Sequence, residues 1–79
     1  MRYLLNMEVI FTRHAKARMR WRGITQNEVM QTIEHADRTE HLGSDRFHSF
    51  YRIGKRYLRV TWVLEERKRV IISVVDKND

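Results

Sequence analysis

The sequence lacks the residues that usually stabilise small secreted domains. It has no cysteine, which excludes a disulfide scaffold, thiol catalysis and a thiolate metal site. It also has no proline and only three glycines, while 42% of its residues are hydrophobic, so a disordered or collagen-like chain is excluded. We therefore expect a compact protein in a reducing cytoplasm.

Long hydrophobic runs are also missing. The apolar residues 3–5 are followed by Asn6 and Glu8, well short of a signal-peptide core or a membrane span. We therefore expect no insertion into a membrane. The four histidines do not have a metal-ligand spacing, and no motif indicates a cofactor, so neither is predicted. Without a repeat or linker, residues 1–79 are expected to form one domain.

Acidic residues are absent from two stretches of the chain. Sixteen Lys and Arg against ten Asp and Glu give a formal net charge of +6. Residues 9–27 and 46–64 contain no acid, and each stretch has five basic residues: Arg13, Lys16, Arg18, Arg20 and Arg22, then Arg46, Arg52, Lys55, Arg56 and Arg59. This separation of charge favours a basic face that binds a polyanion over a surface that is merely solvated.

The hydrophobic pattern predicts an α+β fold. It indicates a strand at about 7–12, a helix that ends near Arg22 before Gly23, and a second helix that begins with the capping box Thr25–Glu28. The remainder reads as strands at 38–42, 46–53, 56–64 and 69–75. We therefore predict a strand, two N-terminal helices and an antiparallel β-meander with the helices on one face.

A two-residue type II′ turn at Gly54-Lys55 sets the register of the central hairpin. Its core face would pair Tyr51 with Leu58, Ser49 with Val60 and Phe47 with Trp62. Its second, basic face would pair Arg52 with Tyr57, Phe50 with Arg59 and His48 with Thr61. An odd-length loop around Glu66 and Lys68 would then place Val70, Ile72 and Val74 beside Leu64, Trp62 and Val60.

The basic sheet face carries groups suited to binding or cleaving RNA. His48 is a candidate general base or acid, Arg59 and Arg52 a candidate phosphate clamp, and Tyr57 or Phe50 a platform on which a base could stack. Further candidate nucleic-acid contacts are Arg22, Arg46, Lys55 and Arg56. The alternative is a solvated, positively charged face that binds nothing in particular.

The first helix carries an unusual polar pair. Helical spacing places His14 and Arg18 at the centre of the inward stripe and Arg13, Lys16 and Arg20 on the solvent side. A buried pair of this kind needs hydrogen bonds. It is either structural, with Arg18 bound to a carboxylate (Glu34, Asp37, Glu40 or Asp76), or catalytic. Trp62 is assigned to packing, whereas Trp21 is left open between packing and ligand stacking.

Residues 14–24 read His-Ala-x-x-Arg-Met-x-x-Arg-Gly-Ile. This motif resembles a family of small prokaryotic proteins and, more distantly, the BrnT and RelE/ParE-type toxins. The resemblance implies a single RelE/ParE-like domain in which His14, Arg18 and Arg22 are the marked positions. The toxin superfamily implies metal-independent cleavage of RNA or, in its ParE branch, inhibition of gyrase.

Together these features predict a toxin-like protein of a toxin–antitoxin type that binds RNA or another polyanion. Metal-independent RNA cleavage is a further hypothesis, with His48, Arg59, His14 and Arg18 as its candidate catalytic residues. The alternatives are a non-catalytic nucleic-acid-binding or regulatory module and a toxin that acts on a protein target. A toxin needs a partner that covers its basic face until release, so a small acidic antitoxin is the expected partner. The sequence leaves a homodimer open.

Overall fold

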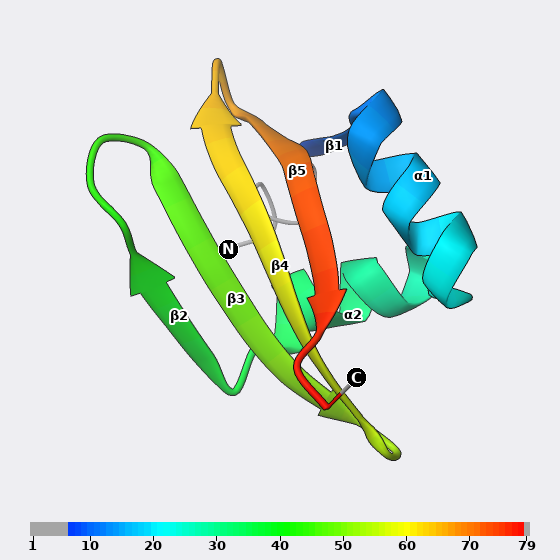
Figure 1. The fold of residues 1–79 in the computed structure, drawn as a ribbon. Helices are drawn as coiled ribbons and strands as arrows, with labels where there is room; N and C mark the ends of the chain where they lie inside the picture. The colour runs from blue at the N-terminus through cyan, green and yellow to red at the C-terminus, as the bar shows by residue number, and fades with distance from the viewer. Residues whose placement is uncertain (1–6, 79) are drawn as a thin grey trace.

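The computed structural model describes residues 7–78, and the apolar residues 3–5 lie outside this range. The described residues form two helices and a five-stranded sheet with the strand order β1-β5-β4-β3-β2 (Figure 1). In chain order the elements are β1 (Glu8–Phe11), α1 (Arg13–Arg22), α2 (Gln26–His35), β2 (Arg38–His41), β3 (Arg46–Ile53), β4 (Arg56–Glu65) and β5 (Lys68–Asp76). This arrangement confirms the predicted α+β class.

The sheet combines an antiparallel meander with one parallel edge strand. Strands β2 to β5 pair antiparallel in chain order, and β1 pairs parallel with the first half of β5, up to Phe11 opposite Ile71. Thr12 ends that pairing, because both its backbone N–H and its hydroxyl donate to the Ile71 carbonyl, at 3.2 and 2.8 Å. From there α1 continues alongside β5 (Figure 1).

Local capping signals set both ends of α1 and the start of α2, and those at Gly23 and Thr25 were predicted. The Thr12 side chain accepts from the Ala15 N–H at the start of α1, and Gly23 closes this helix in the left-handed conformation with φ 68°. Thr25 and Glu28 form a reciprocal capping box at the start of α2, with bonds of 3.1 and 2.9 Å. The short link between these caps lets α2 follow α1 directly.

The helices cover one face of the sheet, α1 against β5 and α2 against β3 and β4. Between the two layers lies a core of apolar side chains: Ala15, Met19, Ile24, Val29, Ile33, Leu58, Val60, Trp62, Ile71 and Val74. Trp62 is only 8% exposed, which confirms its assignment to packing. No helix within residues 7–78 covers the opposite face of the sheet, and Figure 1 views the molecule from that side.

The predicted register of the β3–β4 hairpin is confirmed over its whole length, from Ile53 opposite Arg56 to Phe47 opposite Trp62. Gly54 at the turn has φ 60°, the positive value that the first central position of a type II′ turn requires.

The predicted register between β4 and β5 is wrong over half of the hairpin. The loop is not odd: Glu66 and Arg67 form a two-residue turn in which both φ angles are positive, 50° and 67°. A β-bulge beside Thr61 and Trp62 then shifts the pairing by one residue. As a result Val74 lies beside Val60 as predicted, but Ile71 replaces Ile72 beside Trp62, and Arg69 replaces Val70 beside Leu64.

The predicted inward stripe of α1 is also wrong. Ala15 and Met19 are the buried residues of this helix, whereas His14 is exposed and Arg18 is half-buried. The contact line is rotated by about one residue position, roughly 100°, because α1 packs small and flexible apolar side chains against β5. The expected buried His14–Arg18 pair is therefore absent from the described part of the chain.

Candidate nucleic-acid interface

The uncovered face of the sheet, called the open face below, carries the alternate side chains of β3 and β4. His48, Phe50 and Arg52 of β3 lie beside Thr61, Arg59 and Tyr57 of β4, as the hairpin register predicts. Arg38 of β2 adds to this face opposite Phe50. Three arginines from three strands therefore share one surface with a histidine and two aromatic rings.

A ladder of arginines and aromatic rings forms one end of the open face. The guanidinium carbon of Arg38 lies 4.2 Å from the Phe50 ring centre, and that of Arg52 lies 5.1 Å from the Tyr57 ring centre. The two rings stack on each other at 5.9 Å. Phe50 is only 4% exposed, so it supports its neighbours and is not free to receive a base. Tyr57 remains half-buried beneath Arg52.

His48 is the only histidine on the open face among the described residues. Its side chain is 20% exposed, and its Nδ1 lies 3.7 Å from Oε1 of Glu40 in β2. Burial, and after it the charge of Arg59, lowers the pKa of His48 below its ordinary value of 6.5. The charge of Lys77 adds to this shift and Glu40 opposes it. The lowered pKa favours the neutral imidazole of His48 at pH 7, which is the form able to accept a proton.

Arg59 is the candidate phosphate-binding cation of the open face. It lies across from Phe50 in the hairpin and is half-buried, and its Nε has no hydrogen-bond partner within residues 7–78. The Nε itself is buried, so the terminal N–H groups of this half-buried guanidinium are the ones that could bind a phosphate oxygen. The neutral His48 and the cationic Arg59 together supply a proton acceptor and an anion ligand.

The other predicted nucleic-acid contacts are divided between the two faces. Arg46 and Arg52 are exposed on β3, and Lys55 is exposed in the β3–β4 turn. Arg56 lies instead on the helix side, because it stands opposite Ile53 in the register. There its guanidinium donates to Glu28 Oε1 at 3.1 Å and to the Arg22 carbonyl at 3.3 Å, tying β4 to both helices.

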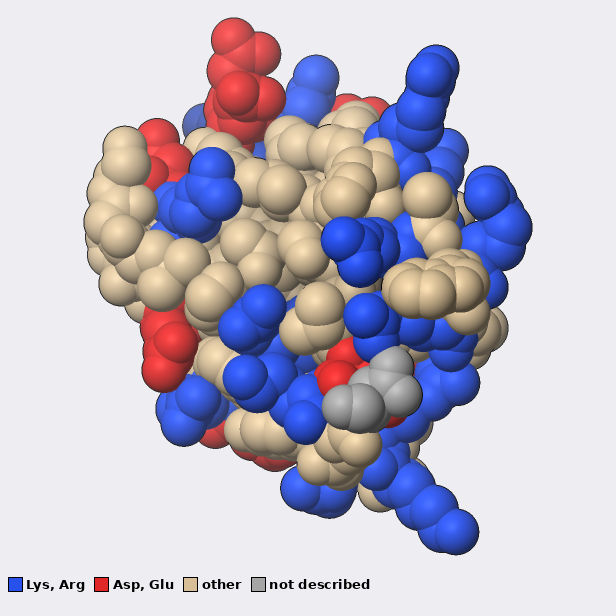
Figure 2. Space-filling view, viewed as in Figure 1, with Lys and Arg blue, Asp and Glu red and all other residues tan. Residues whose placement is uncertain are grey.

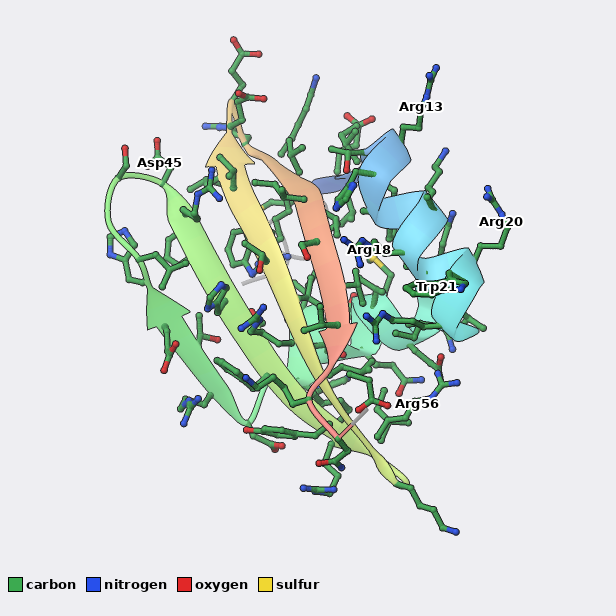
Figure 3. The ribbon with its side chains drawn as sticks, in the orientation of Figure 1. Arg13, Arg18, Arg20, Trp21, Asp45 and Arg56 are labelled. Atoms are coloured by element: carbon green, nitrogen blue, oxygen red, sulfur yellow. The ribbon has the colours of Figure 1, made fainter. Side chains whose placement is uncertain are left out.

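The cations of α1 also divide between two sides. Arg13 and Arg20 point away from the sheet, whereas Arg18 lies on the flank of α1 beside β5 (Figure 3). Because α1 lies alongside β5, this flank is visible in the same view as the open face. Figure 2 shows basic side chains over both the open face and this flank of α1, with acidic side chains near the β4–β5 turn and on the β2 side.

The exposed His14 is not part of the His48 cluster. Glu40, one of the expected carboxylate partners of Arg18, pairs with Arg38 at 3.3 Å.

A hollow of about 400 Å³, not predicted from the sequence, is lined by Trp21, Arg22, Arg56 and Asp76. Trp21 is 77% exposed and contacts the Arg22 guanidinium, whose carbon lies 5.4 Å from the ring centre. A tryptophan in a helix otherwise rich in arginine was the available signal. Asp76 is 55 positions away in the chain, and only the closure of β5 beside α1 brings it to this helix.

Within residues 7–78 there is no group of three or more His, Cys, Asp or Glu side chains arranged to hold a metal ion. No helix in the described range is both long and apolar enough to cross a membrane.

A family model described as a domain of unknown function, DUF4258, matches residues 11–76. The chain belongs to this family. The DUF4258 match spans both helices and the whole meander, so His48, Arg59 and the hollow beside Trp21 all lie within the family domain. Comparison with curated proteins and comparison with solved structures find no match.

Proposed function

We propose that this protein is a toxin-like, cytoplasmic RNA-binding protein and that its open face binds the phosphate backbone. The observation that carries the proposal is the presence of Arg38, Arg52 and Arg59 on one uncovered sheet face, with His48 on the same face beside Glu40. Arginine binds phosphate through paired N–H donors, and a cationic surface attracts RNA from a distance. The proposal applies equally to one copy of the chain and to a homodimer.

The expected partner besides RNA is a small acidic antitoxin. The charge of the open face favours it, because an acidic segment laid across Arg52 and Arg59 would replace the RNA phosphates as their ligand. In this proposal the antitoxin and RNA compete for the same arginines, so adding the antitoxin would release bound RNA.

RNA cleavage is a second candidate function, and the position of His48 is the observation that favours it. A neutral imidazole next to Arg59 is able to take the proton of a 2′-hydroxyl, after which the 2′-oxygen attacks the adjacent phosphorus. Arg59 would stabilise the charge on the phosphorane, and the 5′-oxygen would leave with a proton from Lys77 or solvent. The products would be a 2′,3′-cyclic phosphate and a 5′-hydroxyl, with no metal required.

The binding proposal is tested with two double variants of equal charge. Arg52→Gln with Arg59→Gln removes cations from the open face, and Arg13→Gln with Arg20→Gln removes two that point away from the sheet. Fluorescence anisotropy of a labelled single-stranded RNA should show binding weakened at least about tenfold by the first pair and little changed by the second. Equal weakening by both pairs would contradict the assignment of the open face.

The cleavage candidate has its own test. Induced expression of the wild type should slow growth and fragment cellular RNA, and His48→Ala with Arg59→Ala should abolish both effects. His14→Ala is the matched control, because His14 is exposed on α1 and lies outside the His48 cluster. If the wild type slows growth but cellular RNA stays intact, the cleavage hypothesis is contradicted and a toxin that acts on a protein target is favoured.

A further inference from the structure

The hollow at the end of α1 places an exposed aromatic ring over charged side chains from two strands. Trp21 lies in the last turn of α1, Arg56 begins β4, and Asp76 ends β5. Figure 3 shows Trp21 at the end of α1, with Arg56 below it in this view. At about 400 Å³ the hollow falls within the size range of small-molecule sites, roughly 300–1,000 Å³.

Trp21 does not contribute to the core. Tryptophan is ordinarily highly buried because its large ring gains most from leaving water, yet here the residue is 77% exposed. The guanidinium of Arg22 lies 5.4 Å from the ring centre and restrains the indole by a cation–π contact. An exposed ring that is already restrained is well suited to stack on another flat ring, because little further conformational freedom is lost on binding.

Asp76 brings a hydrogen-bond acceptor into the same hollow. Its Oδ1 accepts from the backbone N–H groups of Tyr57 and Asn78, at 3.2 and 3.0 Å, and these bonds hold the carboxylate in place. Neither of them uses Oδ2. Arg56 in turn is fixed by its bonds to Glu28 and to the Arg22 carbonyl. Asp76 and Arg56 are therefore positioned before any ligand enters.

We propose that this hollow binds a guanine base. The base would stack on Trp21 and donate from its N1–H and N2–H₂ edge to Oδ2 of Asp76. Guanine is the base with two adjacent donors of this kind, and its O6 and N7 acceptors suit the guanidinium of Arg56. Arg18, on the flank of α1 beside β5, is available to the phosphate of the same nucleotide. The site is separate from the open face and does not depend on the function proposed for it.

Guanine could come from a free nucleotide or from RNA, and the test separates these sources. Trp21 is exposed and Trp62 is buried, so quenching by a nucleotide reports on Trp21. Titration of the full chain with GMP should quench the fluorescence, AMP should bind at least about tenfold more weakly, and IMP, which lacks the N2 amino group, should fall between them. For the second source, oligouridylates carrying one guanosine or one adenosine are compared by anisotropy.

Three variants identify the contacts by calorimetry with GMP. Trp21→Ala should weaken binding about tenfold or more, because a stacking surface is lost. Asp76→Asn retains an acceptor at Oδ1 for Tyr57 and Asn78, but replaces Oδ2 by an N–H₂ donor, so it should remove the preference for GMP over AMP. Arg59→Gln is the control and should leave GMP binding unchanged while it weakens binding of RNA to the open face.

A preference for GMP but not for the guanosine-containing oligonucleotide assigns the site to a free nucleotide, and the reverse result assigns it to RNA. The proposal is overturned if neither ligand shows a guanine preference, or if the preference survives in Asp76→Asn. Loss of GMP binding in Arg59→Gln, with thermal melting unchanged, would also overturn it, because the two sites would then be one.

Discussion

The indole N–H of Trp62 donates to the Ser49 hydroxyl across strands β4 and β3, at 2.8 Å in the buried layer of the protein. The same ring stacks on Phe47 at 4.5 Å. We predict that Trp62→Ala lowers the free energy of unfolding by about 3–5 kcal/mol, through lost packing and an unfilled cavity. Ser49→Ala leaves the indole N–H buried without an acceptor and should cost about 1–3 kcal/mol. Urea denaturation measures both.

Trp21→Ala is the matched control for the Trp62 prediction. Its side chain is mostly exposed, so the free energy of unfolding should change by no more than about 0.5 kcal/mol. A destabilisation as large as that of Trp62→Ala would mean that α1 packs differently from the structure described here.

A second prediction concerns the orientation of α1. Met19 is buried against β5 whereas His14 is exposed. Met19→Ala should therefore destabilise the protein by about 2–5 kcal/mol, and His14→Ala by no more than about 0.5 kcal/mol. Thermal or urea denaturation of the two variants decides between this orientation and one with His14 inward, for which the order of the two effects would be reversed.

A third prediction concerns the ionisation of His48. NMR titration should give a His48 pKa below 6.5, because burial and the charge of Arg59 disfavour the imidazolium. Arg59→Gln should raise this pKa and Glu40→Gln should lower it further, since they remove a repulsive and an attractive charge respectively. A His48 pKa that does not respond to Arg59→Gln would contradict the proximity on which the candidate site depends.

The lowered His48 pKa also sets the direction of a stability change. The folded form binds this proton less readily than the unfolded form, so the contribution of neutral His48 is complete above pH 6.5 and is lost as the pH falls through the folded-state pKa. Between about pH 7.5 and pH 5 the wild type should therefore lose more stability than His48→Gln. Denaturant midpoints at both pH values measure the difference.

Local sequence signals were sufficient for most of the fold. The capping box at Thr25, the left-handed Gly23 and the Gly54 turn each fix a backbone conformation within a few residues, and the structure has all three. The β4–β5 register could not be predicted, because the Glu66–Arg67 turn contains neither glycine nor asparagine. The bulge beside Trp62 involves β-branched residues that suit either face, so periodicity could not detect it.

The candidate site was predictable where it depends on the hairpin and unpredictable where it depends on α1. His48, Arg52 and Arg59 share a face because one two-residue turn sets their register. The rotation of α1 depends on how its side chains fit against β5, and the helix pattern alone centres the inward stripe on His14 rather than on Ala15. The hollow at Trp21 depends on that same tertiary fit.

The salt dependence of RNA binding tests the central claim most directly. For single-stranded RNA, the slope of log affinity against log salt concentration is about −0.7 for each phosphate contact. Relative to wild type, Arg52→Gln with Arg59→Gln should make the slope shallower by roughly one to two units, and Arg13→Gln with Arg20→Gln should leave it unchanged. The same change of slope in both double variants, or no binding of RNA by the wild type at low salt, would contradict the assignment of RNA to the open face.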